Sequence, residues 1–453
     1  MITIIGNSVA AIGAIEAIRK VNKDIKIRVI SKEPYRAYGR PVISDYLKGK
    51  AKEEKLMSYR RIGFYEKNNV ELILNEDIVK VDFNSRILYS KNDERYNFEL
   101  LLIACGGTPF IPPIKGKELK NIYTFTTLDD AKRLLNLSKD IKKAVVIGGG
   151  LIGLKAAEGL HAQGVKVSVI ELMDRVLSLA FDKTSGNIVE NRMQDVGIDV
   201  FTEANTEEIL DDGNGNACGI RLKSGRIIDA DMVIIAIGVV PNVSFLKDSG
   251  LNINRGIIVD DHMETNIKGV YAAGDVAEGK DFFSKTNRLL PIWPDAYRQG
   301  RVAGYNMVGE ERIYEGGLSM NSIELFGIPT ISAGIISPDE EDYEVLTYLD
   351  EKKMRYRKIV LRNNRIVGFI FIGDIERAGI FSGLIREQVD VSAFKDELLS
   401  PSFGFINLPY ELRQERFWKR FLDWKDMAPC INEICPSYKE EQTLSDSEVI
   451  DEV

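Results

Sequence analysis

The first thirty residues alternate between apolar runs and a short segment of small residues. Residues 2–5 are β-branched and mostly apolar, and a tight turn of small residues follows at 6–11. The pattern then predicts a helix that ends at Lys20 and a second strand over 26–31. The chain therefore opens with a βαβ unit.

The same order of elements returns about 140 residues later. Apolar residues predict a strand at 144–147, and glycines predict a turn at 148–153. A helix to about Gln163 and a strand at 166–170 complete the second unit. Two such units in one chain predict an α/β fold with two Rossmann-like dinucleotide-binding domains.

The segments between and after the two units indicate how the domains are connected. Residues 111–113 and 115–120 have the composition of a crossover linker. A second crossover is expected near Pro241-Asn242, after an apolar strand at 232–237. The chain is thus expected to leave the first domain, form the second domain and return.

From about Gly316 the pattern changes to short strands separated by turn residues. The predicted elements are strands at 330–336, 356–361 and 366–372 and a helix at about 378–388. These elements predict a small α+β domain. The aromatic-rich segment 401–436 is expected to hold an amphipathic helix packed on the body.

Composition narrows the possible functions. The 453 residues favour roughly two to four domains, and 44% hydrophobic with 28% charged residues is ordinary for a globular protein. Because 60 Lys and Arg stand against 68 Asp and Glu, a nucleic-acid binder with a broad basic face is not expected. Residues 437–453 hold six acidic residues and one lysine, which predicts a solvated, disordered tail.

Cysteine and histidine are both scarce. Four cysteines rule out a disulfide scaffold, and two histidines leave little for a metal site or a Ser-His-Asp triad, so no metal is expected. The chain opens directly into a strand without a basic signal region. No apolar run approaches the roughly 20 residues that span a bilayer. We therefore expect a soluble cytoplasmic protein with no membrane segment.

The second glycine turn has every feature of a dinucleotide-binding turn. Gly148, Gly150 and Gly153 follow a predicted strand and open a predicted helix, so backbone N–H groups can approach a pyrophosphate. Glu171 ends the next strand, where a carboxylate binds the ribose 2′-hydroxyl and repels a 2′-phosphate. NADH is therefore favoured over NADPH, and Arg175 is close enough to temper this preference.

The first turn is a degenerate version of the same motif. Gly6, Ser8 and Ala11 occupy the three motif positions, so small residues replace two of the glycines. Glu33 follows the second strand and is the candidate ribose-binding acid of this unit.

Three further segments give the chain its resemblance to a known family. These are Leu-Leu-Ile-Ala-Cys-Gly-Gly-Thr-Pro at 101–109, Ile-Ala-Ile-Gly-Val-Val-Pro-Asn at 235–242 and Gly-Val-Tyr-Ala-Ala-Gly-Asp-Val at 269–276. With the two turns, they resemble the pyridine nucleotide-disulfide oxidoreductases over roughly residues 1–400. The resemblance implies FAD in the first domain, with its ring facing nicotinamide held by the second. Hydride would then pass from NADH C4 to flavin N5.

The resemblance also implies which residues contact the two cofactors. For FAD these are Gly6, Ser8, Ala11, Glu33, Arg40, Pro41, Ile78, Cys105, Gly106, Gly274, Asp275 and Trp293. For NAD(H) they are Gly148, Gly150, Leu151, Ile152, Gly153, Glu171 and Gly238. Cys105 is expected to be an inert small residue beside FAD.

The segment 33–47 points to one branch of the family. It contains no cysteine, so reduction of a disulfide or peroxide through that route is chemically excluded. Its Tyr-x-Arg-Pro-x-Ile-Ser sequence instead resembles rubredoxin reductases, ferredoxin reductases of oxygenase systems and the flavin module of nitrite reductases. The segment Trp293-x-x-Ala296-x-x-Gln299-Gly300 matches that branch as well.

Two positions depart from that branch, which often has Lys at the position of Asp45 and Glu at the position of Lys155. Because both charges are reversed together, we expect Asp45 and Lys155 to form an ion pair beside the flavin ring, near N5. A cation there would stabilise the reduced anionic flavin and raise its potential. The alternative is two independent, solvent-exposed substitutions.

Two C-terminal segments remain open. Cys430 and Cys435 could form a second redox pair or remain ordinary reduced thiols. The stretch Arg413–Lys425 could dock an acidic electron carrier or pack its aromatic residues on the body.

The expected domain plan is an FAD domain at 1–112 and 243–316, an NAD(H) domain at 113–242, a small α+β domain at 317–400 and an extension at 401–453. The expected activity is electron transfer between NADH and a small acidic carrier, rubredoxin or ferredoxin, in either direction, by a protein that could form a homodimer. The alternatives are an NADH oxidase that reduces O₂ and a diaphorase-like subunit that docks in a larger redox complex through the extension.

Overall fold

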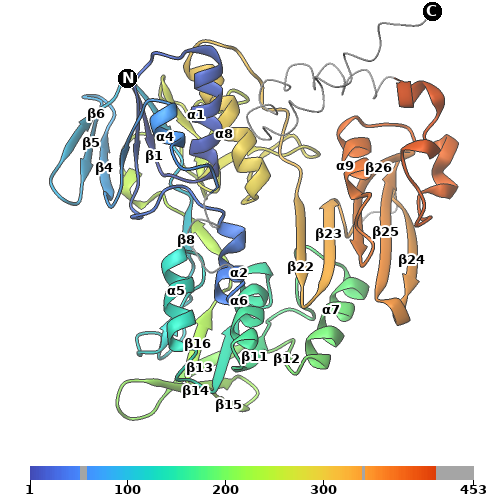
Figure 1. The fold of residues 1–453 in the computed structure, drawn as a ribbon. Helices are drawn as coiled ribbons and strands as arrows, with labels where there is room; N and C mark the ends of the chain where they lie inside the picture. The colour runs from blue at the N-terminus through green and yellow to red at the C-terminus, as the bar shows by residue number, and fades with distance from the viewer. Residues whose placement is uncertain (51–58, 339–341, 415–453) are drawn as a thin grey trace, which may run out of the picture.

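The computed structural model describes residues 1–50, 59–338 and 342–414, and three five-stranded sheets dominate it (Figure 1). We call them the N-terminal, central and C-terminal sheets. The expected helix in 401–436 beyond residue 414, the pair Cys430 and Cys435, and the acidic tail lie outside the described residues.

The N-terminal sheet has the strand order β19-β7-β1-β2-β3, and all its pairings are parallel. Its strands are β1 (Ile2–Ile5), β2 (Ile27–Ile30), β3 (Val70–Ile73), β7 (Leu100–Ile103) and β19 (Val270–Ala272). Every residue of β1 is buried, as expected for a parallel strand covered on both faces.

The central sheet repeats this plan with the parallel order β12-β11-β10-β16-β9. Its strands are β9 (Ile122–Tyr123), β10 (Lys143–Ile147), β11 (Lys166–Ile170), β12 (Asp199–Phe201) and β16 (Met232–Ile235). Its helices are α5 (Leu128–Leu137), α6 (Leu151–Ala162) and α7 (Lys183–Asp195). The predicted repeat of two βαβ units is therefore confirmed.

The C-terminal sheet is antiparallel, with the order β22-β23-β26-β25-β24. Its elements are β22 (Met320–Leu325), β23 (Ile328–Gly334), β24 (Glu344–Asp350), β25 (Arg355–Arg362), β26 (Arg365–Ile372) and α9 (Ala378–Arg386). The buried rings of Phe369 and Phe371 on β26 pack against Phe381 of α9, and the buried ring of Phe403 packs against Phe381 as well. This confirms the expected α+β texture of the segment.

Smaller elements complete the described chain. They are α2 (Ile43–Leu47), α4 (Phe64–Lys67), β4 (Ile78–Asp82), β5 (Ile87–Ser90), β6 (Arg95–Asn97), β13 (Thr206–Asp211), β14 (Ala217–Leu222), β15 (Ile227–Asp229), β18 (Ile257–Ile258), β20 (Ala277–Lys280) and β21 (Asn287–Leu289). Strands β8 (Gly107–Pro109) and β17 (Val239–Pro241) pair as an antiparallel ribbon where the chain crosses between the first two sheets.

Two predicted strands end earlier in the structure, and one strand of the C-terminal sheet is missing from the prediction. The strand predicted at 330–336 ends at Gly334, because a φ of +71° turns the backbone there. The strand predicted at 232–237 ends at Ile235, where the chain bends toward the β8–β17 ribbon. Strand β24 was not predicted, because most of its residues are exposed and it shows no alternation of apolar and polar residues.

The C-terminal sheet shares one apolar core with the central sheet. Leu325, Phe326 and Tyr356 belong to the same buried cluster as Leu154 of α6. Residues of α2, including Leu47, belong to this cluster too. The segment around α2 therefore packs against the central sheet, although it precedes β3 of the N-terminal sheet in the chain. Among the described residues, no helix is long and apolar enough to cross a bilayer.

Helices α1 (Val9–Val21) and α8 (Trp293–Met307) lie side by side against the N-terminal sheet (Figure 1). Their backbones touch at glycines: a Cβ on Gly300 would lie 2.0 Å from the Ala10 carbonyl oxygen, and one on Gly304 would lie 2.5 Å from that of Ala14. Only glycine allows this approach, which brings the amino ends of both helices to the same edge of the sheet.

We predict that Gly300→Ala lowers the free energy of unfolding by about 1–3 kcal/mol or more, because the methyl group must displace a helix backbone. The control is Gly379→Ala in α9, where a Cβ would meet no heavy atom within 4 Å. Alanine there is expected to be neutral or to stabilise by up to about 1 kcal/mol. Urea unfolding of both variants compares them, and equal stability would contradict the close helix contact.

Candidate functional site

The turn after β1 is shaped by one glycine. Gly6 has a φ of +102°, and a Cβ there would lie 2.2 Å from the Ala104 carbonyl oxygen at the end of β7. Helix α1 begins at Val9, directly after Ser8, and Ser8 makes no side-chain capping bond. The first N–H groups of α1 thus remain available to an anion.

The turn after β10 repeats this geometry more strictly. Gly148 has a φ of +115°, and a Cβ there would lie 2.4 Å from the Ala236 carbonyl oxygen at the end of β16. A Cβ on Gly153 would lie 1.9 Å from the Gly148 carbonyl oxygen, so α6 is held tightly against the turn. A Cβ on Gly150 would meet nothing within 4 Å, and no side chain caps the helix. This turn leaves open space in front of unpaired N–H groups.

Glu171 is fixed beside the second turn. Its carboxylate accepts the N–H of Gly149 at 2.6 Å and the N–H of Met173 at 2.8 Å. Arg175, in contrast, bonds Asp174 at 2.6 Å and the Phe181 carbonyl at 3.3 Å. Arg175 therefore forms its hydrogen bonds within its own loop, and it does not neutralise the Glu171 carboxylate.

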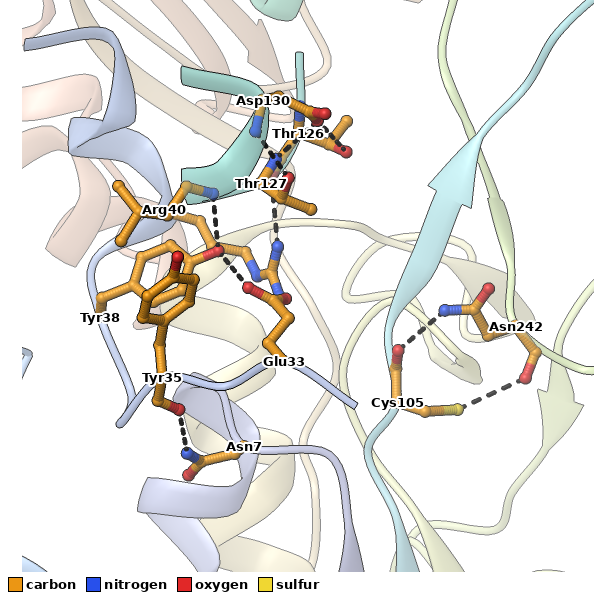
Figure 2. Close-up of polar contacts among 11 residues, drawn as sticks. Asn7, Glu33, Tyr35, Tyr38, Arg40, Cys105, Thr126, Thr127, Asp130 and Asn242 are labelled. Carbon is orange, nitrogen blue, oxygen red and sulfur yellow. Dashed lines mark hydrogen bonds and ion pairs between the residues drawn. The ribbon is translucent and has the colours of Figure 1, made fainter. Parts of the chain in front are cut away.

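Glu33 lies at the centre of a polar network in the first unit (Figure 2). Its carboxylate accepts a hydrogen bond of 2.6 Å from the Tyr38 hydroxyl and forms an ion pair with Arg40. The Arg40 guanidinium also donates to the Thr126 carbonyl at 3.0 Å, and the Leu128 N–H donates to the Tyr38 hydroxyl at 3.1 Å. The network therefore joins the end of β2 to the start of α5.

Two acids predicted to contact FAD face the same cation. Burial raises the pKa of Asp275, and the positive charge of Arg40 opposes that rise. Since Arg40 also pairs with Glu33, its guanidinium interacts with both carboxylates. Burial also raises the pKa of Tyr38 well above its usual range, so its hydroxyl stays protonated and donates to Glu33.

Gln299 of α8 fixes the backbone next to Asp275. Its side-chain oxygen accepts the N–H of Gly274 at 2.7 Å, where φ is +82°. Its amide nitrogen donates to the buried carboxylate of Asp295 at 3.3 Å, and the Tyr314 hydroxyl donates to that carboxylate at 2.5 Å. The sequence places Gln299 in the Trp293–Gly300 motif but gives it no role. The structure shows that its side chain holds the Gly274 backbone and the Asp295 carboxylate.

Cys105 joins the two crossovers (Figure 2). Its thiol donates to the Asn242 carbonyl at 3.3 Å, and the Asn242 amide donates to the Cys105 carbonyl at 2.9 Å. Burial raises the pKa of Cys105 to about 12, which keeps the thiol protonated and a poor nucleophile. Its contacts and protonation agree with an inert residue.

The other predicted cofactor contacts lie on several elements. Trp293 is the first residue of α8 and meets Tyr59 edge to face, with 5.3 Å between ring centres. Ile78 is buried at the start of β4, and Pro41 lies on the exposed turn before α2. Leu151 and Ile152 form the first turn of α6. Gly106 and Gly238, both with positive φ, face open space at the crossovers.

The expected direct ion pair between Asp45 and Lys155 is wrong. The Lys155 ammonium lies 2.6 Å from Glu158 on its own helix and donates to the Glu324 carbonyl at 3.0 Å. Asp45 is 3.8 Å from Lys48. Lys48 follows Asp45 by three residues, and Glu158 follows Lys155 by three residues. Each residue therefore pairs with the opposite charge one helical turn further along its own segment. That i+3 spacing was the available sequence signal for Lys48 and Glu158.

These features fit two dinucleotides. Each parallel sheet ends in a turn that only glycine can form, with an uncapped helix behind it and a carboxylate at the end of the next strand. The Arg40 guanidinium adds a cation beside the first turn. The arrangement is that of a protein class that holds two dinucleotides at the carboxyl edges of two parallel sheets.

The chain belongs to the pyridine nucleotide-disulphide oxidoreductase family, whose model matches residues 1–300. Residues 320–389 match the rubredoxin NAD+ reductase C-terminal domain. These matches confirm the predicted resemblance and fold class.

Three similar proteins illustrate the range of the family. A nitrite reductase (NAD(P)H) of Bacillus subtilis is 35% identical over 88% of this chain, which spans only 49% of that protein. An NADH oxidase of Methanocaldococcus jannaschii is 34% identical over 92% of this chain and 98% of its own length. The crystal structure of NADH:rubredoxin oxidoreductase from Clostridium acetobutylicum, at 28% identity, has a TM-score of 0.70 and covers 86% of this chain and 96% of its own. The chain thus spans about half the length of the nitrite reductase.

We predict that Gly153→Ala and Gly150→Ala separate two roles of the second turn. Both variants weaken NADH binding, by about tenfold or more, because both alter the pyrophosphate-facing turn. Only Gly153→Ala also lowers stability, since its methyl group meets the Gly148 carbonyl whereas that of Gly150 meets open space. Fluorescence titration with NADH and thermal unfolding test this, and wild-type affinity in both variants would contradict it.

Proposed function

We propose that the protein oxidises NADH and passes the electrons through FAD to a small acidic electron-carrier protein, rubredoxin or ferredoxin. The observation that carries the proposal is the state of the flavin-side segment. Residues 33–47 contain no thiol, and the nearby Cys105 is held protonated. Without a reducible disulfide at this position, the electrons have to leave the flavin for an external acceptor. The relatives named rubredoxin reductases support this choice of acceptor.

In this proposal the first turn and its network hold FAD, within a domain that we assign to residues 1–112 and 243–316. When bound, FAD supplies a group that accepts two electrons together and releases them singly. The N–H groups of α1 and the Arg40 guanidinium bind the pyrophosphate, and Glu33 binds the ribose hydroxyls. Tyr38 keeps the Glu33 carboxylate in place, and Gln299 orients the backbone that carries Asp275.

The second turn holds NADH, within a domain that we assign to residues 113–242. The N–H groups of α6 bind its pyrophosphate, and Glu171 binds the ribose hydroxyls beside the turn. The residues that follow, 317–400 and 401–453, are the proposed small domain and extension. We place the protein in the cytoplasm, where thiols persist; both described cysteines, Cys105 and Cys218, are unpaired.

A second candidate is an NADH oxidase that transfers the electrons to O₂. The observation in its favour is the relative of that name in Methanocaldococcus jannaschii, which aligns over 98% of its length. Such an enzyme needs only reduced flavin that O₂ can reach. The two candidates therefore differ in the acceptor and not in the site.

We predict that NADH reduces the bound flavin rapidly in anaerobic stopped-flow. Mixing the reduced protein with oxidised rubredoxin or ferredoxin is then expected to reoxidise the flavin at least tenfold faster than air-saturated buffer does. The measurement is flavin absorbance after each mixing step. Rapid reoxidation by O₂ alone would establish the oxidase instead, and absence of reduction by NADH would contradict both candidates.

We predict that Glu171→Ala raises the preference for NADPH relative to NADH by about tenfold or more, because a carboxylate that repels the 2′-phosphate is removed. The control is Asp199→Ala. Asp199 begins β12, so it lies toward the amino-terminal ends of the strands, whereas Glu171 follows the carboxyl end of β11. There Asp199 pairs with Lys166 at 3.5 Å. The ratio of kcat/KM values for the two nucleotides is the measurement, and an unchanged ratio in Glu171→Ala would remove Glu171 from the ribose site.

A further inference from the structure

A buried carboxylate on α6 is bracketed by two ammonium groups. Glu158 lies 2.7 Å from the Lys48 ammonium and 2.6 Å from that of Lys155. The side chains of Lys48, Glu158 and Lys155 are only 6%, 10% and 12% exposed. The other oxygen of Glu158 accepts the N–H of Phe326 at 3.0 Å. We call Lys48, Lys155 and Glu158 the charged triad.

The charged triad lies where three parts of the chain meet. Lys48 directly follows α2, which continues from the turn that holds Arg40. Lys155 and Glu158 lie on α6, which begins at the second glycine turn. Phe326 belongs to the turn between β22 and β23 of the C-terminal sheet. Glu158 therefore contacts Lys48 at the end of α2, Lys155 on α6 and the β22–β23 turn of the C-terminal sheet at once.

Apolar packing seats α2 on α6 at the same place. A Cβ on Gly159 would lie 2.5 Å from a methyl carbon of Leu47, so the Leu47 side chain rests on the helix backbone. The Gln163 amide donates to the Leu47 carbonyl at 2.8 Å. The apolar contact of Leu47 with Gly159 is non-directional, so it does not fix the position of α2 along α6. The ion pair of Lys48 with Glu158 is directional and does fix it.

The charged triad contains one carboxylate and two ammonium groups, so it carries a net positive charge. Burial alone would raise the pKa of Glu158, but the two ammonium groups lower it below its usual range. Asp45, 3.8 Å from Lys48 and 42% exposed, offsets the remaining positive charge only in part. Such a network is sensitive to loss of its single anion, because two like charges would then share a buried site.

We propose that Glu158 is a positioning residue for hydride transfer, which sets the distance between the flavin and the nicotinamide by locking α2 onto α6. This inference rests on the proposed function. The segment before α2 carries Arg40, and the first turn of α6 receives the NAD pyrophosphate. Hydride transfer requires reacting atoms about 3–3.5 Å apart, so a small displacement of one segment against the other slows it strongly.

A second buried carboxylate provides a matched control. Asp182 accepts hydrogen bonds from the Tyr356 hydroxyl at 2.7 Å and from the Lys358 ammonium at 2.9 Å. It joins the start of α7 to β25 of the C-terminal sheet, and none of its hydrogen bonds or ion pairs reaches α2. If Glu158 merely holds the C-terminal sheet in place, changing Asp182 has the same effect.

The test uses the FAD-loaded full chain and the variants Glu158→Gln, Lys48→Gln and Asp182→Asn. Lys48→Gln cuts the link to α2 but leaves Glu158 and Lys155 as a balanced pair, so it answers the question even if Glu158→Gln does not fold. Anaerobic stopped-flow measures the flavin-reduction rate at saturating NADH and with NADH deuterated at C4. FAD content, the flavin spectrum and NADH affinity are measured alongside.

We expect Glu158→Gln and Lys48→Gln to lower the saturating reduction rate tenfold or more, with FAD retained, NADH affinity within about threefold and a larger deuterium isotope effect. Asp182→Asn is expected to stay within about twofold of the wild-type rate. Wild-type reduction rates in both triad variants would overturn the proposal. So would equal slowing by Glu158→Gln and Asp182→Asn with Lys48→Gln unaffected. Failure of the wild-type protein to react with NADH would instead refute the proposed function.

Discussion

The structure depends on one backbone contact that occurs twice. In each parallel sheet, the glycine after the middle strand lies against the carbonyl oxygen of the residue that follows a neighbouring strand. These contacts are Gly6 against Ala104 and Gly148 against Ala236. No side chain fits between them, so the chain must turn sharply and start a helix whose N–H groups face outward. Each contact thus packs the turn against the carboxyl edge of the sheet and also shapes that turn to bind an anion.

The same contact determines how the two sites are joined. Ala104 and Ala236 are the last residues before the chain leaves each sheet, and the strands that follow, β8 and β17, pair with each other. Thr108 lies opposite Val240 in this ribbon, and the Cys105–Asn242 bonds close its end. The two turns are therefore tied by backbone pairing directly behind them. A cysteine at this position serves as a small, half-buried residue, since a protonated thiol adds no charge beside the site.

The sequence revealed the local parts of this arrangement and missed the contacts between side chains. Strands β1 and β11, both glycine turns and the following helices were predictable because β-branched runs and glycines act on their immediate neighbours. The pairing of Arg40 with Glu33, and the role of Tyr38 between them, depends on how the loop after β2 folds back. The Asp45–Lys155 pair failed for the same reason: matching charges along two helices do not specify which helical turns meet.

The charged triad and the shared apolar core act together in holding α2. Replacing a buried ion network by apolar residues is often neutral or stabilising, so stability alone gives little reason to keep two lysines and a glutamate there. The apolar contacts of Leu47 already hold α2 on the central sheet. Apolar contact tolerates sliding, however, and a one-residue shift along α6 amounts to about 1.5 Å. A directional network that rejects such a shift is useful where two bound groups must meet within a fraction of that distance, which is the requirement for hydride transfer.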